Sequence, residues 1–215
     1  MPTPVGDALL RFVAAQFGTL FNFPGKVLHG LIHDVYYQPS DADTQLGTGK
    51  AELQWHVEDG CHEHRPHWLV LVCLRGDPHA VTYLARASDL RFTAAQQQLI
   101  ADTPVTLAWD DSFHDADQRP SAHVRTLSPG PNGREVIFDP AYTVDRGQPV
   151  EQVLALVGRE ADAVARPVIL EHGDVLVLQN RRLLHARSSF EPKTDGAGRW
   201  IKRGLVTEDP IHAVT

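Results

Sequence analysis

Apolar residues recur at helical spacing in two segments of the chain. In residues 7–18 they fall on one face of a predicted amphipathic helix, with Asp7 as a candidate N-terminal cap and Gly18 as the stop. Residues 149–164 begin with a proline, which suits a first helical turn, and carry apolar residues at i, i+3, i+4 and i+7. A shorter helix is predicted at residues 93–102.

Strand-like runs separated by Pro, Gly and Asp turns make up most of the remaining chain. They lie at residues 27–37, 51–58, 67–76, 80–85, 105–111, 122–128, 134–140, 174–180, 183–190 and 199–208. Many strands with few helices predict a mainly β fold with flanking helices, as a sandwich or barrel. Because no linker interrupts the pattern, we expect one domain over residues 1–215.

Charge and composition narrow the classes of partner. The chain has 20 basic and 27 acidic residues, a net charge of −7 and no dense basic block, which argues against nucleic acid or an anionic membrane. It also has no apolar run near the roughly 18 residues that span a bilayer, and no signal-peptide pattern, so we expect a cytoplasmic protein. The only cysteines, Cys61 and Cys73, are expected to be free thiols.

The stretch QWHVEDG, residues 54–60, places a histidine and a glutamate two positions apart in a predicted strand. Alternation would put His56 and Glu58 on one face, with Trp55 and Val57 on the other. Such a pair is common on solvated strands, so it needs a third ligand to become a metal site. His185, in GDVLVLQNRRLLHARSSF, is the candidate, because two histidines and one carboxylate form the facial triad that suits non-haem Fe(II).

Two arginines follow in GRWIKRGLV. Strand alternation puts Arg199, Ile201 and Arg203 on one face and Trp200 and Lys202 on the other. A guanidinium fork binds a carboxylate in bidentate fashion, so two inward arginines beside a metal would hold two carboxylates. Salt bridges across the sheet are the alternative use of these side chains.

In combination these motifs resemble the clavaminate synthase-like group of Fe(II)/2-oxoglutarate-dependent oxygenases, especially the arginine and asparagine β-hydroxylases of antibiotic biosynthesis. The resemblance covers most of residues 26–90 and 134–207 and includes AELQWHVEDGCHEH and DGAGRWIKRGLV. It implies a jelly roll (double-stranded β-helix), the cofactors Fe(II), 2-oxoglutarate and O₂, and hydroxylation of an unactivated carbon of an amino acid or derivative, including a basic, arginine-like one.

The resemblance also assigns roles to individual positions. His56, Glu58 and His185 match the iron ligands. Arg199 matches the residue that binds the distal carboxylate of 2-oxoglutarate, and Thr82 the hydroxyl that assists it. The positions that meet the substrate are Arg203, on its α-carboxylate, and Asp139, which lies where related enzymes place substrate-contacting acids.

The sequence departs from the family pattern in three places. Val57 replaces a frequent threonine and Ala186 a frequent glycine, and neither side chain is a ligand. Only 55 residues precede His56, where relatives usually have a much longer region. We therefore expect a more open site, or one completed by another copy or a partner subunit.

Other interpretations use the same residues. The run HVEDGCHEHRPH could hold zinc through Cys61, His62, His64 or His67, although no second cysteine pair exists.

Three acidic residues of WDDSFHDAD, Asp110, Asp111 and Asp115, form an exposed loop or hold a cationic substrate group. The seven remaining histidines, His33 among them, show no partner pattern.

With the same cofactors the reaction could instead be desaturation or ring formation. A jelly-roll protein that binds a metal or a partner without turnover is the alternative of another class.

Overall fold

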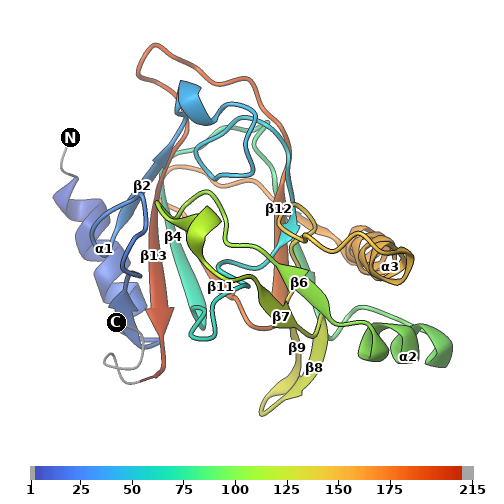
Figure 1. Cartoon of the computed structure of the whole chain (residues 1–215). Coiled ribbons are helices and arrows are strands. Elements are labelled where there is room, and N and C mark those ends of the chain that lie inside the picture. The colour runs from blue at the N-terminus through green and yellow to red at the C-terminus, as the bar shows by residue number, and fades with distance from the viewer. Residues whose placement is uncertain (1–2, 210–215) are drawn as a thin grey trace.

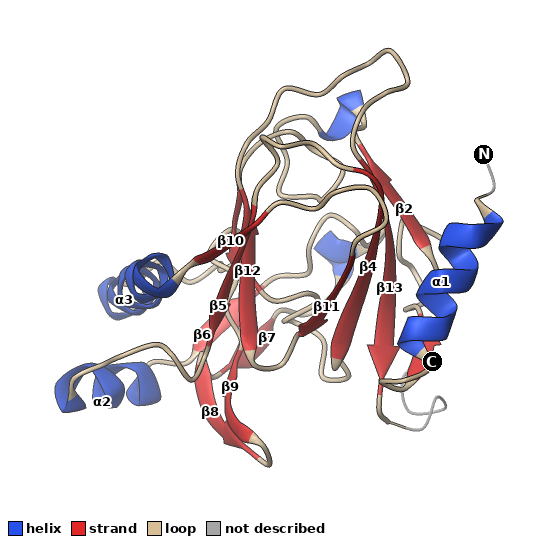
Figure 2. Cartoon of the chain, turned by 180° about the vertical axis from the view of Figure 1, so that it is seen from behind, coloured by secondary structure: helices blue, strands red, loops and turns tan. Residues whose placement is uncertain are grey.

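A mainly β architecture of two facing antiparallel sheets characterises the chain, whose computed structural model describes residues 3–209 (Figures 1 and 2). The helices are α1 (Pro4–Ala14), α2 (Ala94–Asp102) and α3 (Gln148–Val164), with short 3₁₀ turns at Pro39–Asp41 and Ala116–Gln118. The strands are β1 (Thr19–Phe21), β2 (His33–Tyr36), β3 (Leu53–His56), β4 (Trp68–Arg75), β5 (Thr82–Arg86), β6 (Val105–Leu107), β7 (Ala122–Val124), β8 (Leu127–Gly130), β9 (Gly133–Val136), β10 (Arg166–Val168), β11 (Val175–Gln179), β12 (Leu183–Arg187) and β13 (Trp200–Thr207).

The larger sheet has the order β1-β13-β4-β11, and β2 also pairs with β13. The smaller sheet has the order β10-β5-β12-β3, and two separate hairpins, β6-β7 and β8-β9, complete the strands. Sequence-distant strands are therefore neighbours: β3 pairs with β12, and β13 with β2 and β4. This arrangement brings the candidate residues of the two halves of the chain together.

The hydrophobic pattern explains where each element lies. Strand β4, WLVLVCLR, is almost continuously apolar because it is central in the larger sheet and covered on both faces. Phe21, Leu69 and Leu205 are buried in a cluster formed from β1, β4 and β13. A larger cluster joins β3, β5 and β12 to α3, which lies against the smaller sheet as the apolar spacing of residues 149–164 predicts (Figure 1).

The two predicted helices at 93–102 and 149–164 are confirmed, and α2 begins with a capping box in which Thr93 and Gln96 exchange hydrogen bonds. The first helix differs from the prediction. It begins at Pro4 instead of being capped by Asp7, because the proline suits the first turn. Asp7 lies inside that turn, where its carboxylate is 2.9 Å from Nζ of Lys202 on β13.

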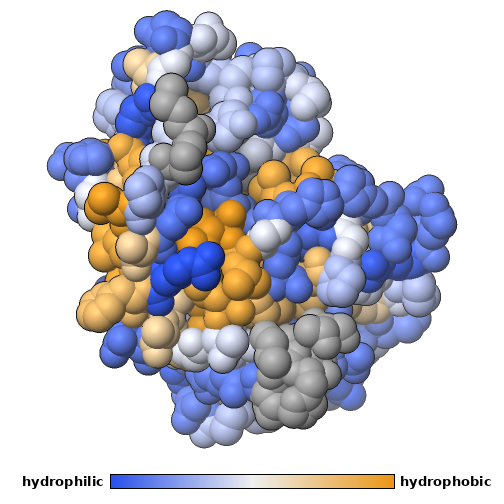
Figure 3. All heavy atoms as spheres, turned by 90° about the vertical axis from the view of Figure 1, so that its left-hand side faces the viewer, coloured by the Kyte–Doolittle hydropathy of each residue, from blue (hydrophilic) through white to orange (hydrophobic). Residues whose placement is uncertain are grey.

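Helix α1 packs directly on the larger sheet. A Cβ on Gly204 of β13 would lie 2.7 Å from a methyl carbon of Leu10, so a larger residue there would force the Leu10 side chain to move. The outer side of α1 is apolar as well, since Val5 and Phe12 are 81% and 69% exposed. Figure 3 views the side on which α1 lies and shows apolar side chains gathered in the middle of this face. Within residues 3–209, no helix is both long and apolar enough to cross a membrane.

Candidate metal centre and its cavity

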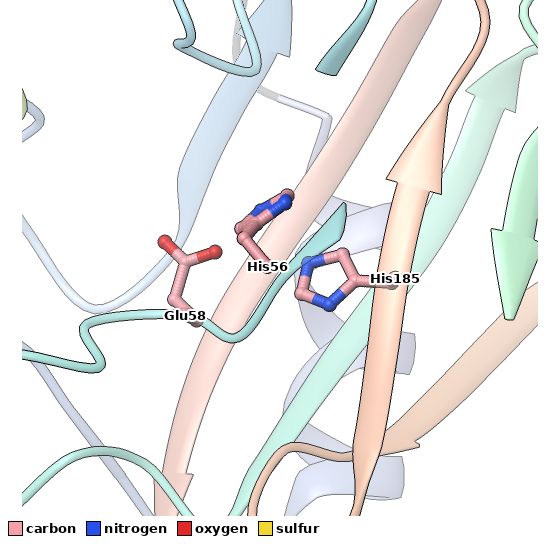
Figure 4. Close-up of side chains that lie close together, drawn as sticks. All are labelled: His56, Glu58 and His185. Atoms are coloured by element: carbon pink, nitrogen blue, oxygen red, sulfur yellow. The ribbon is translucent and has the colours of Figure 1, made fainter. Parts of the chain in front are cut away.

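Two histidines of the smaller sheet face each other beside a glutamate. His56 ends β3 and His185 lies in β12, and the two are direct partners in the antiparallel ladder. Their ring centroids are 4.1 Å apart. Ligand atoms of His56, Glu58 and His185 all lie within 4.8 Å of one another, and no other such group of His, Cys, Asp or Glu occurs in the described part of the chain (Figure 4). The predicted three residues are thus brought together.

Glu58 reaches this group from a loop, not from the strand that the alternation predicts. Strand β3 ends at His56, because Val57 donates its N–H to Phe138 and the backbone of Asp59 takes a left-handed conformation with φ 53°. The carboxamide of Asn180 then holds the glutamate, accepting from the Glu58 N–H at 2.8 Å and donating to its carbonyl oxygen at 2.9 Å. Trp55 and Val57 are buried behind the site, as predicted.

The protonation of these side chains fits a divalent cation. Burial alone would raise the pKa of Glu58, but the charges of Arg203 and Lys26 outweigh burial and lower it to about 2. Burial lowers the pKa of His185 well below its ordinary value, so its imidazole is neutral. Nδ1 of His56 lies 2.8 Å from the carbonyl of Gln54, which leaves Nε2 for a metal. Nδ1 of His185 is buried without a partner among the described residues.

A cavity of about 540 Å³ opens beside the three residues. The lining residues come from both sheets and include Thr82, Asp139, Arg199 and Arg203, all predicted to bind cosubstrate or substrate. Asp110 also lines it, whereas Asp111 is an exposed hydrogen-bond partner of Tyr142. The three-residue group therefore has a space beside it large enough for small organic ligands.

Arg199 lines the cavity and forms no ion pair within residues 3–209. Among the described residues, no carboxylate lies within ion-pair distance of its guanidinium, although burial lowers its pKa and Cys73 and Asp77 lie nearby. Thr82 of β5 is 6% exposed and lines the same cavity. A buried charge is costly unless it is paired, so Arg199 is suited to receive an anion.

Arg203 is already engaged. Its Nη1 lies 2.7 Å from Oε1 of Glu58, and its Nη2 lies 3.3 Å from Nδ1 of His33. Its Nε is buried and unpartnered among the described residues. The predicted alternation holds, because Arg199, Ile201 and Arg203 line the cavity, whereas Trp200 and Lys202 on the other face do not.

Six carboxylates line the cavity, and their partners differ. Five accept hydrogen bonds or ion pairs from side chains: Asp34 from Lys202 and Trp200, Asp41 from Thr48, Glu58 from Arg203, Asp59 from Lys26, and Asp110 from Ser112. Asp139 accepts instead from the backbone N–H of Tyr142 at 3.3 Å, and no side chain of the described residues donates to it. Burial raises the pKa of Asp139 to about 6.

The residues of the zinc interpretation do not gather. Cys61 is buried and burial raises the pKa of its thiol, which disfavours a thiolate ligand. The ring of His62 stacks on Phe23 at 4.1 Å, while Nδ1 of His67 lies near Thr207 and the backbone of Glu208. Asp115 likewise pairs with Arg119 outside the cavity.

Three residues near the centre were missed by the sequence patterns. Lys26 is 1% exposed and pairs with Asp59, His33 is 2% exposed beside Arg203, and Asn180 is fully buried against Glu58. His33 had been grouped with histidines that lack partners. Each of them contacts a residue that is distant in the sequence, so no local spacing predicts its position near the centre.

Comparisons with known proteins agree with this geometry, although no protein-family model matches the chain. The chain is 29% identical to an L-asparagine oxygenase of Streptomyces coelicolor, covering 95% of this chain and 62% of that protein. It is 31% identical to an L-lysine 3-hydroxylase of Catenulispora acidiphila, covering 84% and 53%.

Among solved structures, asparagine oxygenase in complex with Fe(II), 3-hydroxyasparagine and succinate superposes with a TM-score of 0.88. Sequence identity in that match is 27%, and it covers 95% of this chain and 65% of the other. The non-heme iron oxygenase OrfP, in complex with Fe and α-ketoglutaric acid, gives a TM-score of 0.80 at 27% identity, covering 96% and 65%. The chain spans less than two thirds of the length of each of these proteins.

Proposed function

We propose that this chain, which belongs to the clavaminate synthase-like group of Fe(II)/2-oxoglutarate-dependent oxygenases, hydroxylates an unactivated carbon of an amino acid or a close derivative. The facing antiparallel sheets would form a single jelly-roll domain over residues 1–215. One observation carries the proposal: His56, Glu58 and His185 converge beside a cavity that also contains Arg199, for which the described residues provide no carboxylate partner.

The three residues would hold the metal through two imidazoles and one carboxylate. Fe(II) together with 2-oxoglutarate would supply the activation of O₂ and the oxidising power for hydroxylation. The chain's own part is to keep these ligands deprotonated and in place, which the lowered pKa values of Glu58 and His185 and the Asn180 contacts support.

Arg199 would bind the distal carboxylate of 2-oxoglutarate. A guanidinium that has no internal anion gains most from a bidentate carboxylate, since its burial is otherwise uncompensated. Thr82 would donate its hydroxyl to the same cosubstrate from β5.

The substrate would lie between Arg203 and Asp139. Arg203 keeps an unpartnered Nε that could donate to the α-carboxylate, even while Nη1 holds Glu58. Asp139 is the cavity carboxylate without a side-chain donor among the described residues, so it would accept from a polar or cationic substrate side chain. Several relatives are named for such substrates, among them an L-ornithine/L-arginine 3-hydroxylase.

Turnover of a panel of amino acids tests the proposal. Purified protein with Fe(II) and 2-oxoglutarate should form succinate with at least one of L-asparagine, L-lysine, L-arginine and L-ornithine, and the product should be heavier by one oxygen atom. A product that has instead lost two hydrogen atoms would identify desaturation or ring closure. Size measurement of the same protein tests whether a second copy or partner subunit completes the site.

His185→Ala supplies the matched control. The variant should retain the fold, bind Fe(II) at least tenfold more weakly, and form no succinate above background, because one of three ligands is lost. Absence of both iron binding and turnover in the unmodified protein would reject the oxygenase proposal in favour of a non-catalytic protein.

A further inference from the structure

A buried ammonium group stands behind the cavity wall. Lys26 is 1% exposed, and its Nζ forms an ion pair with Asp59 and donates to Oγ of Ser112 at 2.6 Å. The same Nζ lies 4.2 Å from the centre of the Phe113 ring, in a cation–π contact. Burying an isolated ammonium costs much free energy, and these contacts offset that cost for Lys26.

The partners of Lys26 line the cavity, although Lys26 itself does not. Asp59, Ser112 and Asp110 are all wall residues, and Asp110 accepts hydrogen bonds from both the hydroxyl and the N–H of Ser112. We call Asp59, Asp110 and Ser112 the acidic cluster. Asp59 directly follows Glu58 in the chain, and the cluster offers two carboxylates and a hydroxyl near one ammonium.

The backbone supports this arrangement from three loops. Val27 donates its N–H to Ser112 at 2.7 Å, and Lys26 forms an isolated β-bridge with Phe113. Asp59 is the one non-glycine residue with positive φ in the described part of the chain. Burial alone would lower the pKa of Lys26, but the nearby carboxylates of Asp59, Asp110 and Glu58 raise it, so the ammonium stays charged.

We propose that Lys26 is a specificity-determining residue whose ammonium permanently occupies a cation-binding site formed by the acidic cluster. The Lys26 ammonium thus occupies the position beside the acidic cluster to which a substrate ammonium would otherwise be attracted. A cationic substrate group is directed to Asp139, the cavity carboxylate without a side-chain partner among the described residues. This consequence for the substrate rests on the proposed function, whereas the cation site itself does not.

Supplying a small ammonium ion to a variant that lacks the Lys26 side chain tests the cation site without measuring turnover. Lys26→Ala removes the atoms that n-propylammonium contains, so the variant should show a saturable rise in unfolding temperature of several degrees when n-propylammonium chloride is added. The unmodified protein and Lys26→Met, in which the space is filled, should show no saturable rise. Tetramethylammonium chloride, which has the charge but no N–H donor, controls for ionic strength.

A second variant separates the acidic cluster from general cavity filling. Lys26→Ala with Asp59→Asn should lose at least tenfold in affinity for n-propylammonium, because the ion-pair partner is gone. Equal stabilisation of the single and double variants would overturn the proposal. If Lys26→Ala is folded only in the presence of n-propylammonium, that dependence supports it, and if it is unfolded under both conditions the site has no exchangeable cation and the proposal fails.

Lys26→Met tests the consequence for specificity. It keeps the bulk of the side chain but removes the charge, so the ratio of kcat/KM for L-lysine to that for the neutral L-norleucine should rise about tenfold. Adding Asp59→Asn should return the ratio toward that of the unmodified protein. An unchanged ratio in Lys26→Met would overturn the specificity role. If the unmodified protein forms no succinate with any amino acid, the proposed function fails, and the n-propylammonium experiment still decides the cation site.

Discussion

Arg199, just before β13, and Arg203, within it, line the same cavity, yet they differ in the residues that they contact. Arg203 is paired with Glu58 and His33, whereas Arg199 has no carboxylate partner among the described residues. The carboxylates of the cavity divide in the same way, since Lys26 forms an ion pair with Asp59, while no side chain in residues 3–209 donates to Asp139. A charge that is paired within the chain therefore maintains the site, whereas a charge without a partner is available to a ligand.

Arg199→Ala should have the largest effect on ligand binding and little effect on folding. Losing two charge-assisted hydrogen bonds should raise the KM for 2-oxoglutarate by about a thousandfold. The unfolding free energy should stay equal or rise, because the half-buried charge that is removed has no carboxylate partner among the described residues. Titration of 2-oxoglutarate and urea denaturation measure the two quantities, with Arg199→Lys as the control. A clear loss of stability would show that Arg199 has an internal partner after all.

Arg203→Ala should, in contrast, reduce the stability of the metal-free protein. The carboxylate of Glu58, with its side chain only 11% exposed, would lose its counter-ion, so the unfolding free energy should fall by about 3 kcal/mol. Urea denaturation in the presence of a chelator measures this loss. Adding Glu58→Gln should recover most of it, since no buried anion remains. A loss in Arg203→Ala no larger than in Arg199→Ala would remove the distinction between the two arginines.

Asp139 should give the smallest of these effects, visible in the pH profile. Its pKa is raised by burial to about 6, so the carboxylate is neutral below that pH and negatively charged above it. For a substrate with a cationic side chain, kcat/KM should therefore rise about tenfold as the pH increases from 5 to 7, and then level off. Asp139→Asn should flatten this limb at its low value. A limb that persists in the variant belongs to another group.

The strands and the convergence of the three candidate metal ligands were predictable because their signals are local. Continuous apolar runs such as that of β4 mark central strands, and His56 with Glu58 and the stretch around His185 carry recognisable spacing. The prediction was wrong in placing Glu58 on the strand, since a hydrogen bond to Phe138 and the left-handed turn at Asp59 end β3 earlier. The alternation of strand residues does not reveal a hydrogen-bond partner that lies in a distant loop.

The contacts that tune the centre could not be predicted in this way. Lys26 lies 33 positions from Asp59 and 86 from Ser112, and Arg203 lies 145 positions from Glu58. In each pair the contact between the two side chains offsets the cost of burying them, and that contact forms only where distant segments meet, so the individual residues look like ordinary charged side chains in sequence. His33 looked uninformative for the same reason, because its partner is 170 positions away.

The carboxamide of Asn180 has a consequence for how long the ligand geometry persists. It is fully buried and binds both the N–H and the carbonyl of Glu58, a residue outside any strand. We expect the Glu58 amide to exchange with solvent deuterium as slowly as amides in the middle of β4, through opening of the whole sheet and not through local fraying. One side chain would thus give a loop residue the exchange lifetime of a strand, and the candidate metal ligand would keep its orientation between one binding event and the next.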